Sequence, residues 1–269
     1  MAVNFVSKLK YDISDLLKIM EILRSPEGCP WDREQSHESI KKSLIEETYE
    51  VVEAINKNDK ELMTEELGDV LLQVVFHSQI ARENGEFDFS DVCDGICKKL
   101  IERHPHVFGD VSVKDSGEVL ENWEQIKSRT KHRKTQTDKM LSVPRELPAL
   151  MRSTKIQEKA AKVGFDWDDV SGAFDKLSEE SEELKAAVKN NDTENMTEEL
   201  GDLLFSAVNV SRFIGVDAEE ALTASTDKFL NRFSVVERLA KERNIDMERS
   251  SIEELDRLWD EAKVITKSN

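Results

Sequence analysis

Apolar residues recur along the chain at the three- and four-residue spacing that is typical of amphipathic helices. Such a stripe runs through residues 44–55 and is interrupted by the polar stretch 56–59. It resumes over residues 67–75, so the pattern predicts two helices joined by a short turn. A third amphipathic segment, at about 91–103, ends before Pro105, because proline cannot continue a helix.

The second half of the chain shows the same pattern. Apolar positions at helical spacing run over 177–188 and 200–208, on either side of the polar turn 190–192. Further helices are predicted at 149–163, at 218–242 and after a capping box formed by Ser251 and Glu254, the last of these helices carrying Trp259.

An internal repeat accounts for this similarity between the halves. The heptapeptide MTEELGD occurs at residues 63–69 and again at 196–202, which is an offset of 133 residues. Without gaps, the same offset aligns residues 46–80 with 179–213, and 17 of those 35 positions are identical. A match of this extent within one chain indicates that one helical module has been duplicated.

The predicted fold is therefore all-α, with two tandem modules of related structure. We place the N-terminal module at residues 1–130 and the C-terminal module at 149–269. The stretch 131–148 between them is basic and polar and contains two prolines, which predicts a linker. Because a helical hairpin cannot bury its apolar stripe alone, we expect four-helix-bundle-like cores that are completed by packing between modules or between subunits.

Composition favours helices and limits the kinds of partner. The 269 residues include only 10 glycines and 5 prolines, while 35% are charged. The formal net charge of −18 would repel nucleic acid and anionic membranes, so we expect neither as a partner. Three cysteines without a disulfide framework, no signal-peptide pattern and no long apolar run together predict a cytoplasmic protein.

Clustered acidic residues are the main candidates for chemistry. Glu47 and Glu50 are three residues apart and share a helix face, as do Glu66 and Asp69 on the next predicted helix. Both pairs lie roughly 9 Å from the intervening turn at the helical rise per residue, so antiparallel packing brings the two pairs level. The second copy repeats this arrangement with Glu180, Glu183, Glu199 and Asp202.

Four level carboxylates repel one another unless cations neutralise them. Oxygen ligands without histidine or cysteine fit Mg²⁺, with Mn²⁺ as the alternative. A di-iron site is disfavoured, because His77 is out of register for a Glu-x-x-His pattern and the second copy has Val210 there. The alternative interpretation, in which the acids bind no metal, is a solvated acidic helix face. Each copy also has a glycine inside a predicted helix, Gly68 or Gly201. Because glycine destabilises a helix interior, we expect another backbone to approach closely at these positions.

Basic and aromatic residues near these acids are candidates for nucleotide binding. Lys228 and Arg232 are four residues apart on one predicted helix, and Lys176 precedes Glu180 by four. These cations could neutralise phosphates, and Trp259 could stack on a base. The alternatives are ordinary surface charge for the cations and a buried core position for the tryptophan.

The same residues lie within stretches that resemble the MazG family of nucleoside triphosphate pyrophosphohydrolases, part of the all-α NTP pyrophosphatase superfamily. The resemblance covers nearly the whole chain, and it is carried by GCPWDREQ (28–35), EETYEVVEAI (46–55), ELGDVLLQVVFH (66–77), RHPHVFGDV (103–111), WEQIK (123–127), LPALMRSTKIQ (147–157), VGFDW (163–167) and EELGDLLFSAVN (198–209). It implies hydrolysis of an NTP or dNTP such as ATP to the monophosphate and pyrophosphate. It also implies Mg²⁺, broad base acceptance and a homodimer.

The resemblance further implies which residues form the site. The metal ligands would be Glu180, Glu183, Glu199 and Asp202 in the C-terminal module and Glu47, Glu50, Glu66 and Asp69 in the N-terminal module. The nucleotide-binding residues would be Lys176, Glu180, Glu198, Asp202, Lys228, Arg232 and Trp259. At 195–196 the chain departs from the charged residues expected there. The C-terminal module would be the main catalytic one.

We expect Glu180 and Glu183 to act in catalysis through the metal, and Glu179 to orient or deprotonate the attacking water. Two functions of other classes remain open from the sequence. One is a regulatory module that binds nucleotides without turnover, and the other is a helical dimerisation scaffold whose acids are only solvated.

Overall fold

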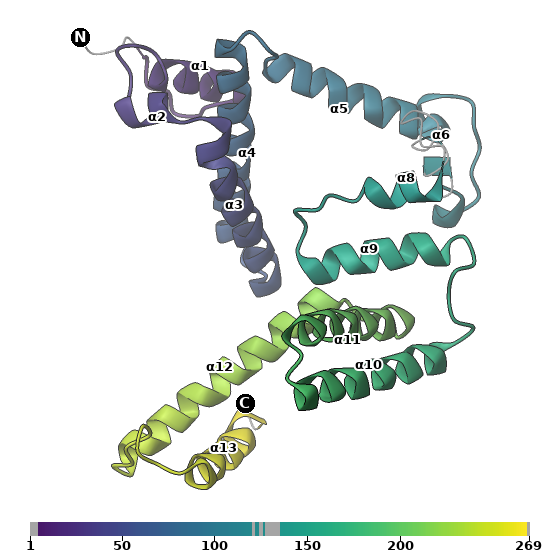
Figure 1. Ribbon diagram of the computed structural model, residues 1–269. Coiled ribbons are helices and arrows are strands. Elements are labelled where there is room, and N and C mark those ends of the chain that lie inside the picture. The colour runs from purple at the N-terminus through teal and green to yellow at the C-terminus, as the bar shows by residue number, and fades with distance from the viewer. Residues whose placement is uncertain (1–4, 120–121, 124–125, 127–134, 268–269) are drawn as a thin grey trace. The chain divides into compact units, whose positions relative to one another are not determined.

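The computed structural model describes residues 5–119, 122–123, 126 and 135–267, and helices make up all the regular secondary structure in these ranges (Figure 1). The chain divides into two compact units, Met1–Lys127 and Ser128–Asn269. The all-α prediction with two tandem modules is therefore confirmed.

The first unit is built around a long antiparallel hairpin of α3 (His37–Lys57) and α4 (Lys60–Glu83). The helix α1 (Ile13–Leu23) packs against α4, and a short α2 (Pro30–Glu34) leads into the hairpin. The helices α5 (Phe89–Arg103) and α6 (Pro105–Phe108) follow it. The core of this unit lies between α1, α3 and α4 and consists of Met20, Ile40, Val75, Phe76 and Ile80.

A tight turn sets the alignment of α3 with α4. Asn58 adopts the left-handed conformation with φ 52°, which asparagine tolerates better than most residues. Asp59 then caps α4, since its side chain accepts a hydrogen bond from the backbone N–H of Leu62 at 3.0 Å. This turn fixes which residues of the two helices stand at the same height.

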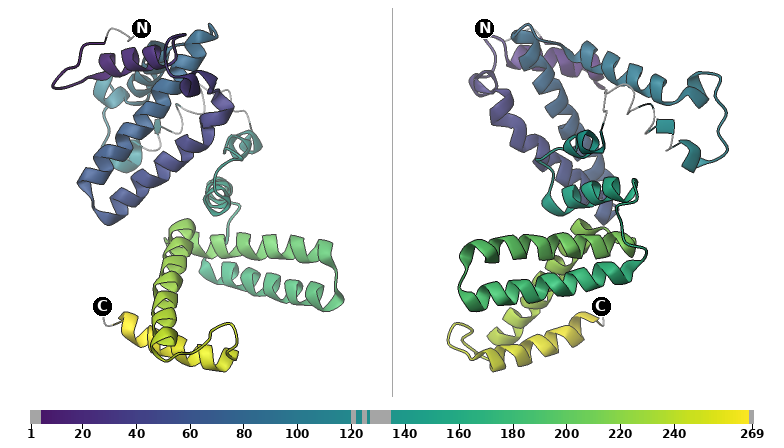
Figure 2. Two further views of the ribbon diagram at one scale, coloured as in Figure 1. Left: turned by 90° about the vertical axis from the view of Figure 1, so that its left-hand side faces the viewer. Right: turned by 45° about the vertical axis from the view of Figure 1, so that its right-hand side comes forward.

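The second unit contains the equivalent hairpin, α10 (Val170–Asn190) and α11 (Thr193–Phe213), which lie side by side along their length in both views of Figure 2. Its turn uses the same devices, with Asn191 at φ 54° and Asp192 accepting from the backbone N–H of Asn195 at 3.2 Å. The helices α8 (Gln136–Leu141) and α9 (Ala149–Ala161) precede the hairpin, and α9 packs against α11.

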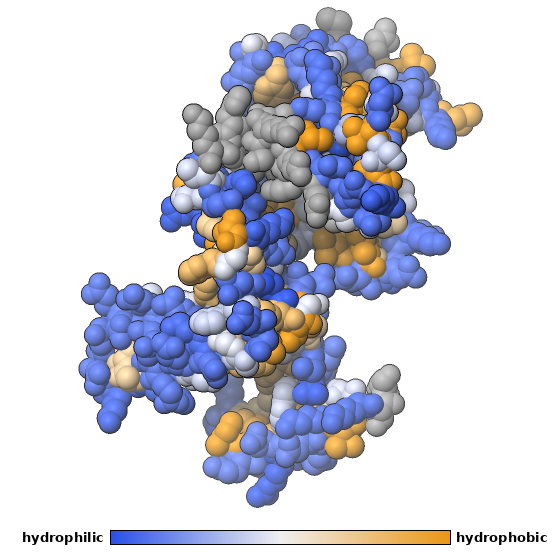
Figure 3. Space-filling model, turned by 90° about the vertical axis from the view of Figure 1, so that its right-hand side faces the viewer, coloured by the Kyte–Doolittle hydropathy of each residue, from blue (hydrophilic) through white to orange (hydrophobic). Residues whose placement is uncertain are grey.

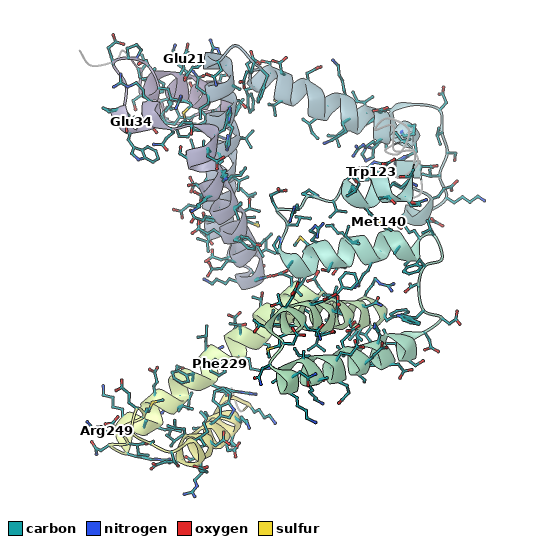
Figure 4. The ribbon with its side chains drawn as sticks, in the orientation of Figure 1. Glu21, Glu34, Trp123, Met140, Phe229 and Arg249 are labelled. Carbon is teal, nitrogen blue, oxygen red and sulfur yellow. The ribbon has the colours of Figure 1, made fainter. Side chains whose placement is uncertain are left out.

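After the hairpin, α12 (Ala218–Glu242) and α13 (Ile252–Lys267) pack against each other. Their shared core is formed by Val236, Leu239, Ala240, Leu258 and Ala262. Phe229 projects from α12 towards α13, where its ring centroid lies 5.1 Å from that of Trp259 (Figure 4). The bounds of α12 coincide with those predicted from the hydrophobic pattern.

The third long helix of each unit leaves apolar side chains exposed. On α5 these are Val92, Ile96, Leu100 and Ile101, and on α12 they are Leu222, Phe229, Leu230 and Phe233. Exposed apolar rows of this kind occur where a helix lacks a packing partner. The expectation that each bundle is completed by packing between modules or between subunits stays a prediction.

The structure differs from the sequence prediction at the linker. The predicted linker 131–148 contains α8, which packs against α9, and Val143 is buried. Thr135 and Asp138 form a capping box, in which the Thr135 hydroxyl accepts from the backbone N–H of Asp138 at 3.0 Å. This local cap starts a helix in a stretch whose basic composition suggested none.

The prediction for the two helical glycines is wrong. A Cβ atom placed on Gly68 or on Gly201 would meet no atom within 4 Å, apart from the helix's own neighbouring backbone. Both glycines lie on exposed faces of their hairpins, so their presence is not explained by packing within the chain.

Surface character follows the composition. The face drawn in Figure 3 is largely hydrophilic, with apolar side chains exposed in separate patches. No helix in the described part of the chain combines the length and the apolar character needed to cross a bilayer.

Candidate functional site

The hairpin of the second unit gathers three carboxylates at one level. Glu180 on α10 and Glu199 and Asp202 on α11 each offer an oxygen, and these oxygens all lie within 4.8 Å of one another. Glu180 is only 3% exposed, so its carboxylate is held out of water. A buried carboxylate beside two others is costly unless a cation neutralises it.

The hairpin of the first unit repeats the cluster. Glu47 on α3 and Glu66 and Asp69 on α4 bring their oxygens within 4.8 Å of one another. His77 does not join them. Its Nδ1 lies 2.8 Å from Nδ1 of His37, and the two rings stack. Both clusters were expected from the spacing of the acids and the length of the turn.

The fourth carboxylate of each predicted set lies beside its cluster. Burial, and then contact with Glu180, raises the pKa of Glu183. Burial, and then repulsion from Glu183 and Glu180, raises the pKa of Glu199.

The acids of the first unit are perturbed in the same way. Burial, and then contact with Glu50, raises the pKa of Glu47. Burial followed by repulsion from Glu50 raises the pKa of Glu66. The ionised form is thus disfavoured in both clusters, which is the condition that a divalent cation would relieve.

Lys176 stands against the cluster of the second unit. Its Nζ lies 2.6 Å from Glu180 and 3.1 Å from Glu179, and both contacts raise the pKa of the lysine. Glu179 is itself exposed on the outer side of this contact. At the repeat offset of 133, the first unit has Ser43 in place of Lys176. The two clusters therefore share their carboxylates but not this cation.

A cavity of about 710 Å³ opens beside the second cluster. Lys176, Glu180 and Asp202 form part of its wall, so the acids and the cavity belong to one site. The remaining wall comes from α8, α9, α11 and the segment before α10, and consists of Met140, Ile156, Gln157, Ala160, Gly164, Phe165, Asp166, Trp167, Phe205, Ser206, Asn209 and Arg212. Met140 is labelled on α8 in Figure 4.

Sequence reasoning missed this cavity. The segment VGFDW was recognised only as part of a resemblance, although two aromatic residues placed just before an acidic helix were a usable signal. In the first unit, a cavity of about 110 Å³ lies among residues of α1, α4 and the start of α5, and none of the clustered acids lines it.

Three predicted nucleotide-binding residues lie elsewhere in the second unit. The guanidinium of Arg232 lies over the indole of Trp259 at 6.0 Å, and both residues belong to the α12–α13 pair together with Lys228. None of the three lines the described cavity. Glu198 is exposed on α11, next to the ligand candidate Glu199. The roles of these residues stay predictions.

Comparison with known proteins gives consistent matches. Residues 35–108 and 171–236 match the model of the MazG nucleotide pyrophosphohydrolase domain. The nucleoside triphosphate pyrophosphohydrolase/pyrophosphatase MazG of Thermotoga maritima is 50% identical over 249 residues, covering 93% of this chain and 94% of the relative. The nucleoside triphosphate pyrophosphohydrolase of Escherichia coli K12 is 46% identical over 254 residues, covering 93% and 97%.

A solved structure also matches part of the chain. The crystal structure of a mazG-related protein from Thermotoga maritima covers 43% of this chain and 99% of its own, with 29% identity and a TM-score of 0.38. Each of the two domain matches includes the acidic hairpin of one unit.

Proposed function

The chain belongs to the MazG family of nucleotide pyrophosphohydrolases, and from this membership we infer that it is a nucleoside triphosphate pyrophosphohydrolase. The reaction converts an NTP or dNTP and water into the monophosphate and pyrophosphate. The observation that supports assigning this function to particular residues is the composition of the cavity wall in the second unit. Carboxylates that could bind a metal and a lysine that could bind phosphate line the same cavity.

Hydrolysis takes place mainly in the second unit. Its cluster adjoins a cavity of about 710 Å³, which lies within the range of about 300–1,000 Å³ that small-molecule sites occupy. It also has Lys176, for which the first unit offers Ser43. These two differences support placing the catalytic site there rather than in both units.

The carboxylates fit a hard divalent cation, which we take to be Mg²⁺ with Mn²⁺ as the alternative. The donors are oxygens only, and the raised pKa values of Glu183 and Glu199 reflect negative charge that lacks neutralisation. The ligands would be Glu180, Glu183, Glu199 and Asp202 in the second unit, with Glu47, Glu50, Glu66 and Asp69 in the first. When bound, such a cation supplies positive charge to the phosphates and lowers the pKa of a bound water.

The chain's own residues bind the phosphates and position the water. Lys176 is held over the cluster by Glu179 and Glu180, and its three N–H donors could bind phosphate oxygens. Glu179 is exposed beside Lys176 and could orient or deprotonate the attacking water. Lys228, Arg232 and Trp259 would contribute if their helices meet the nucleotide in an assembly.

We further propose a homodimer. The exposed apolar rows of α5 and α12 are surfaces that a second copy can cover, and a dimer would complete bundles that each chain leaves open. The protein is proposed to act in the cytoplasm on free nucleotides with broad base acceptance. Neither nucleic acid nor a membrane is proposed as a partner, given the net charge of −18.

The test is pyrophosphate release from ATP, dGTP and dTTP with Mg²⁺, using the wild type and the separate variants Glu180→Gln and Glu47→Gln. We expect Glu180→Gln to abolish most of the activity and Glu47→Gln to retain it. The two substitutions remove the same carboxylate from the two copies, so each serves as the control for the other. Full activity in Glu180→Gln would overturn the choice of unit.

Binding without turnover in the wild type would favour a regulatory module. If the wild type shows neither nucleotide binding nor stabilisation by Mg²⁺, the acids are only a solvated face and the protein is a helical scaffold.

A further inference from the structure

Two histidines of the first unit lie against each other where its hairpin begins. His37 is the first residue of α3, and His77 lies in the second half of α4. We propose that this pair is a pH-sensitive latch. It holds the start of α3 against α4 while at least one ring is neutral and releases it when both rings are protonated. The proposal concerns the conformation of the first unit and does not depend on the proposed function.

A hydrogen bond joins the two rings. Nδ1 of His37 lies 2.8 Å from Nδ1 of His77, and the ring planes are parallel to within 3°. This is an ordinary hydrogen-bond distance, so one nitrogen carries a proton and the other accepts it. The bond cannot form when both nitrogens carry protons, because neither then has a lone pair with which to accept.

The latch therefore responds to the second proton that the pair takes up. After the first proton is added, the charged ring still donates to the neutral one, and the bond remains in place. The second proton removes the acceptor and leaves two positive charges on nitrogens that stand 2.8 Å apart. Repulsion then separates the rings, and with them the helices that carry them.

The surroundings of His77 disfavour its charged form. Burial, and then the charge of His37, lowers the pKa of His77 below its ordinary value of 6.5. Its Nε2 is buried without a hydrogen-bond partner, so no acceptor stabilises the proton that a charged ring carries there. The neutral ring thus contributes stability that is complete above pH 6.5 and is lost as the pH falls below that value.

The charged groups of the surrounding helices are engaged in contacts of their own. Among the described residues, His37 is the group whose charge acts on the pKa of His77. The neighbouring contacts are those of Lys8 with Asp15, of Lys18 and Arg82 with Glu21, of Arg24 with Glu83, of Glu38 with Lys41, and of Asp88 and Asp91 with backbone N–H groups at the start of α5. These acids are therefore not placed to neutralise a doubly charged pair.

The pair stands at the edge of the core of the first unit. Ile40 follows His37 by three residues on α3, and Phe76 and Ile80 lie on either side of His77 along α4. These three apolar residues are 3–5% exposed and belong to one core cluster. Repulsion within the pair consequently acts where the start of α3 meets α4, at the end of the hairpin that is remote from its connecting turn.

The second copy of the hairpin shows that packing does not require these histidines. The helices α3 and α10 begin at residues 37 and 170, which are 133 apart like the rest of the repeat. At this offset His37 corresponds to Val170 and His77 to Val210. Both members of the pair are thus valine in the second unit, and Val210 is 8% exposed. The valines occupy these positions without any titratable group, so the latch is assigned to the first unit alone.

Hydrogen exchange of the full chain in EDTA tests the latch. The protection of amides 38–44, in the first turns of α3, is compared at about pH 7.5 and about pH 5 after correction for the intrinsic exchange rate. In the wild type we expect a fall of about 10-fold at the lower pH, the scale of one lost buried hydrogen bond. Amides 171–177 of α10 are the internal standard and should keep their protection.

The double variant His37→Val with His77→Val gives the first unit the residues of the second. In this variant the protection of amides 38–44 should change with pH no more than that of amides 171–177. His104→Gln is the matched control, because it removes a histidine of the same unit that lies after α5 and outside the pair. This control should lose protection at low pH as the wild type does.

A titration of the wild type keeps the proposal testable if the double variant does not fold. By proton NMR, the two rings should titrate in two coupled steps, the second of them below pH 6.5. Independent single-step titration of the rings would overturn the proposal. An equal loss of protection in the wild type and a folded double variant would also overturn it. So would an equal loss in both hairpins of the wild type, because acid would then act on the chain as a whole.

Discussion

Removing the Lys176 amine is expected to destabilise the metal-free protein and to slow hydrolysis. In the structure its Nζ lies 2.6 Å from Glu180, whose side chain is 4% exposed, while the lysine itself is 39% exposed. Lys176→Ala leaves a buried carboxylate without its cation. Loss of one partner from a fully buried pair costs about 3–5 kcal/mol, and an exposed pair is worth about 0–1 kcal/mol. For this half-exposed pair we expect about 1–2 kcal/mol.

Thermal melting in EDTA and in Mg²⁺ measures this effect. A loss of about 1–2 kcal/mol corresponds to a fall in Tm of roughly 3–6 °C for a unit of this size. The fall should be much smaller in Mg²⁺, because the cation replaces the lysine as the partner of Glu180. If Lys176 also binds phosphate, kcat/KM for ATP should drop about 10- to 100-fold, the worth of one hydrogen bond to a charged group.

Lys185→Ala provides the control on the same helix. Lys185 pairs with Glu182 at 2.7 Å, but the two side chains are 66% and 73% exposed. Its removal should change neither Tm nor kcat/KM appreciably. Adding Glu180→Gln to Lys176→Ala should recover part of the lost stability, since the unpaired charge is removed as well. An equal fall in Tm with and without Mg²⁺, or a fall no larger than that of Lys185→Ala, would refute the reasoning.

Two further predictions follow from the clusters and the cavity. Because the folded-state pKa values of Glu183 and Glu199 are raised above their ordinary value of 4.5, the metal-free native state binds more protons than the unfolded chain, and its stability falls as pH rises above about 4.5. Mg²⁺ should therefore raise Tm more at about pH 7.5 than at about pH 5, and an equal rise at both would contradict the cluster as its binding site. In a calorimetric titration, Gly172→Ala should weaken binding of the α,β-methylene analogue of ATP by displacing Trp167 from the cavity wall, whereas Gly95→Ala, whose Cβ meets nothing within 4 Å, should bind it normally.

Local sequence signals were sufficient for the two hairpins, for α12 and for the grouping of the acids. The period of apolar residues located α12 at its observed bounds, and the Asn-Asp turns set the register of both hairpins. Since that register is fixed by a turn only a few residues long, the spacing of Glu and Asp along the chain determines which carboxylates meet.

The cavity could not be derived in the same way. Its wall combines α8, α9, the VGFDW segment and α11, which are brought together by tertiary packing rather than by any periodic pattern. The helix α8 was missed because a capping box of two residues outweighed a composition that favours a linker. The glycine prediction failed because a helical glycine signals close packing only if another element covers that face, and no element among the described residues does so.

The reaction requires carboxylates for a metal and groups that bind the nucleotide, and the two duplicated hairpins differ in which of these they contain. Both copies keep four carboxylates, and burial together with neighbouring acids raises the pKa of Glu47 and Glu66 in the first copy and of Glu183 and Glu199 in the second. Such an arrangement destabilises a protein unless a cation is bound. At the corresponding positions the first copy has Phe76 and Ser43, so it lacks the asparagine and the lysine that line the cavity of the second copy. Because the first copy has the costly acids without those groups, we predict that its cluster binds a divalent cation that stabilises the fold. On this view, removing divalent cations with a chelator should lower the stability of the Glu180→Gln variant, in which the first cluster is the intact one. In the Glu47→Gln variant, the part of the stability loss that comes from the first cluster should be absent.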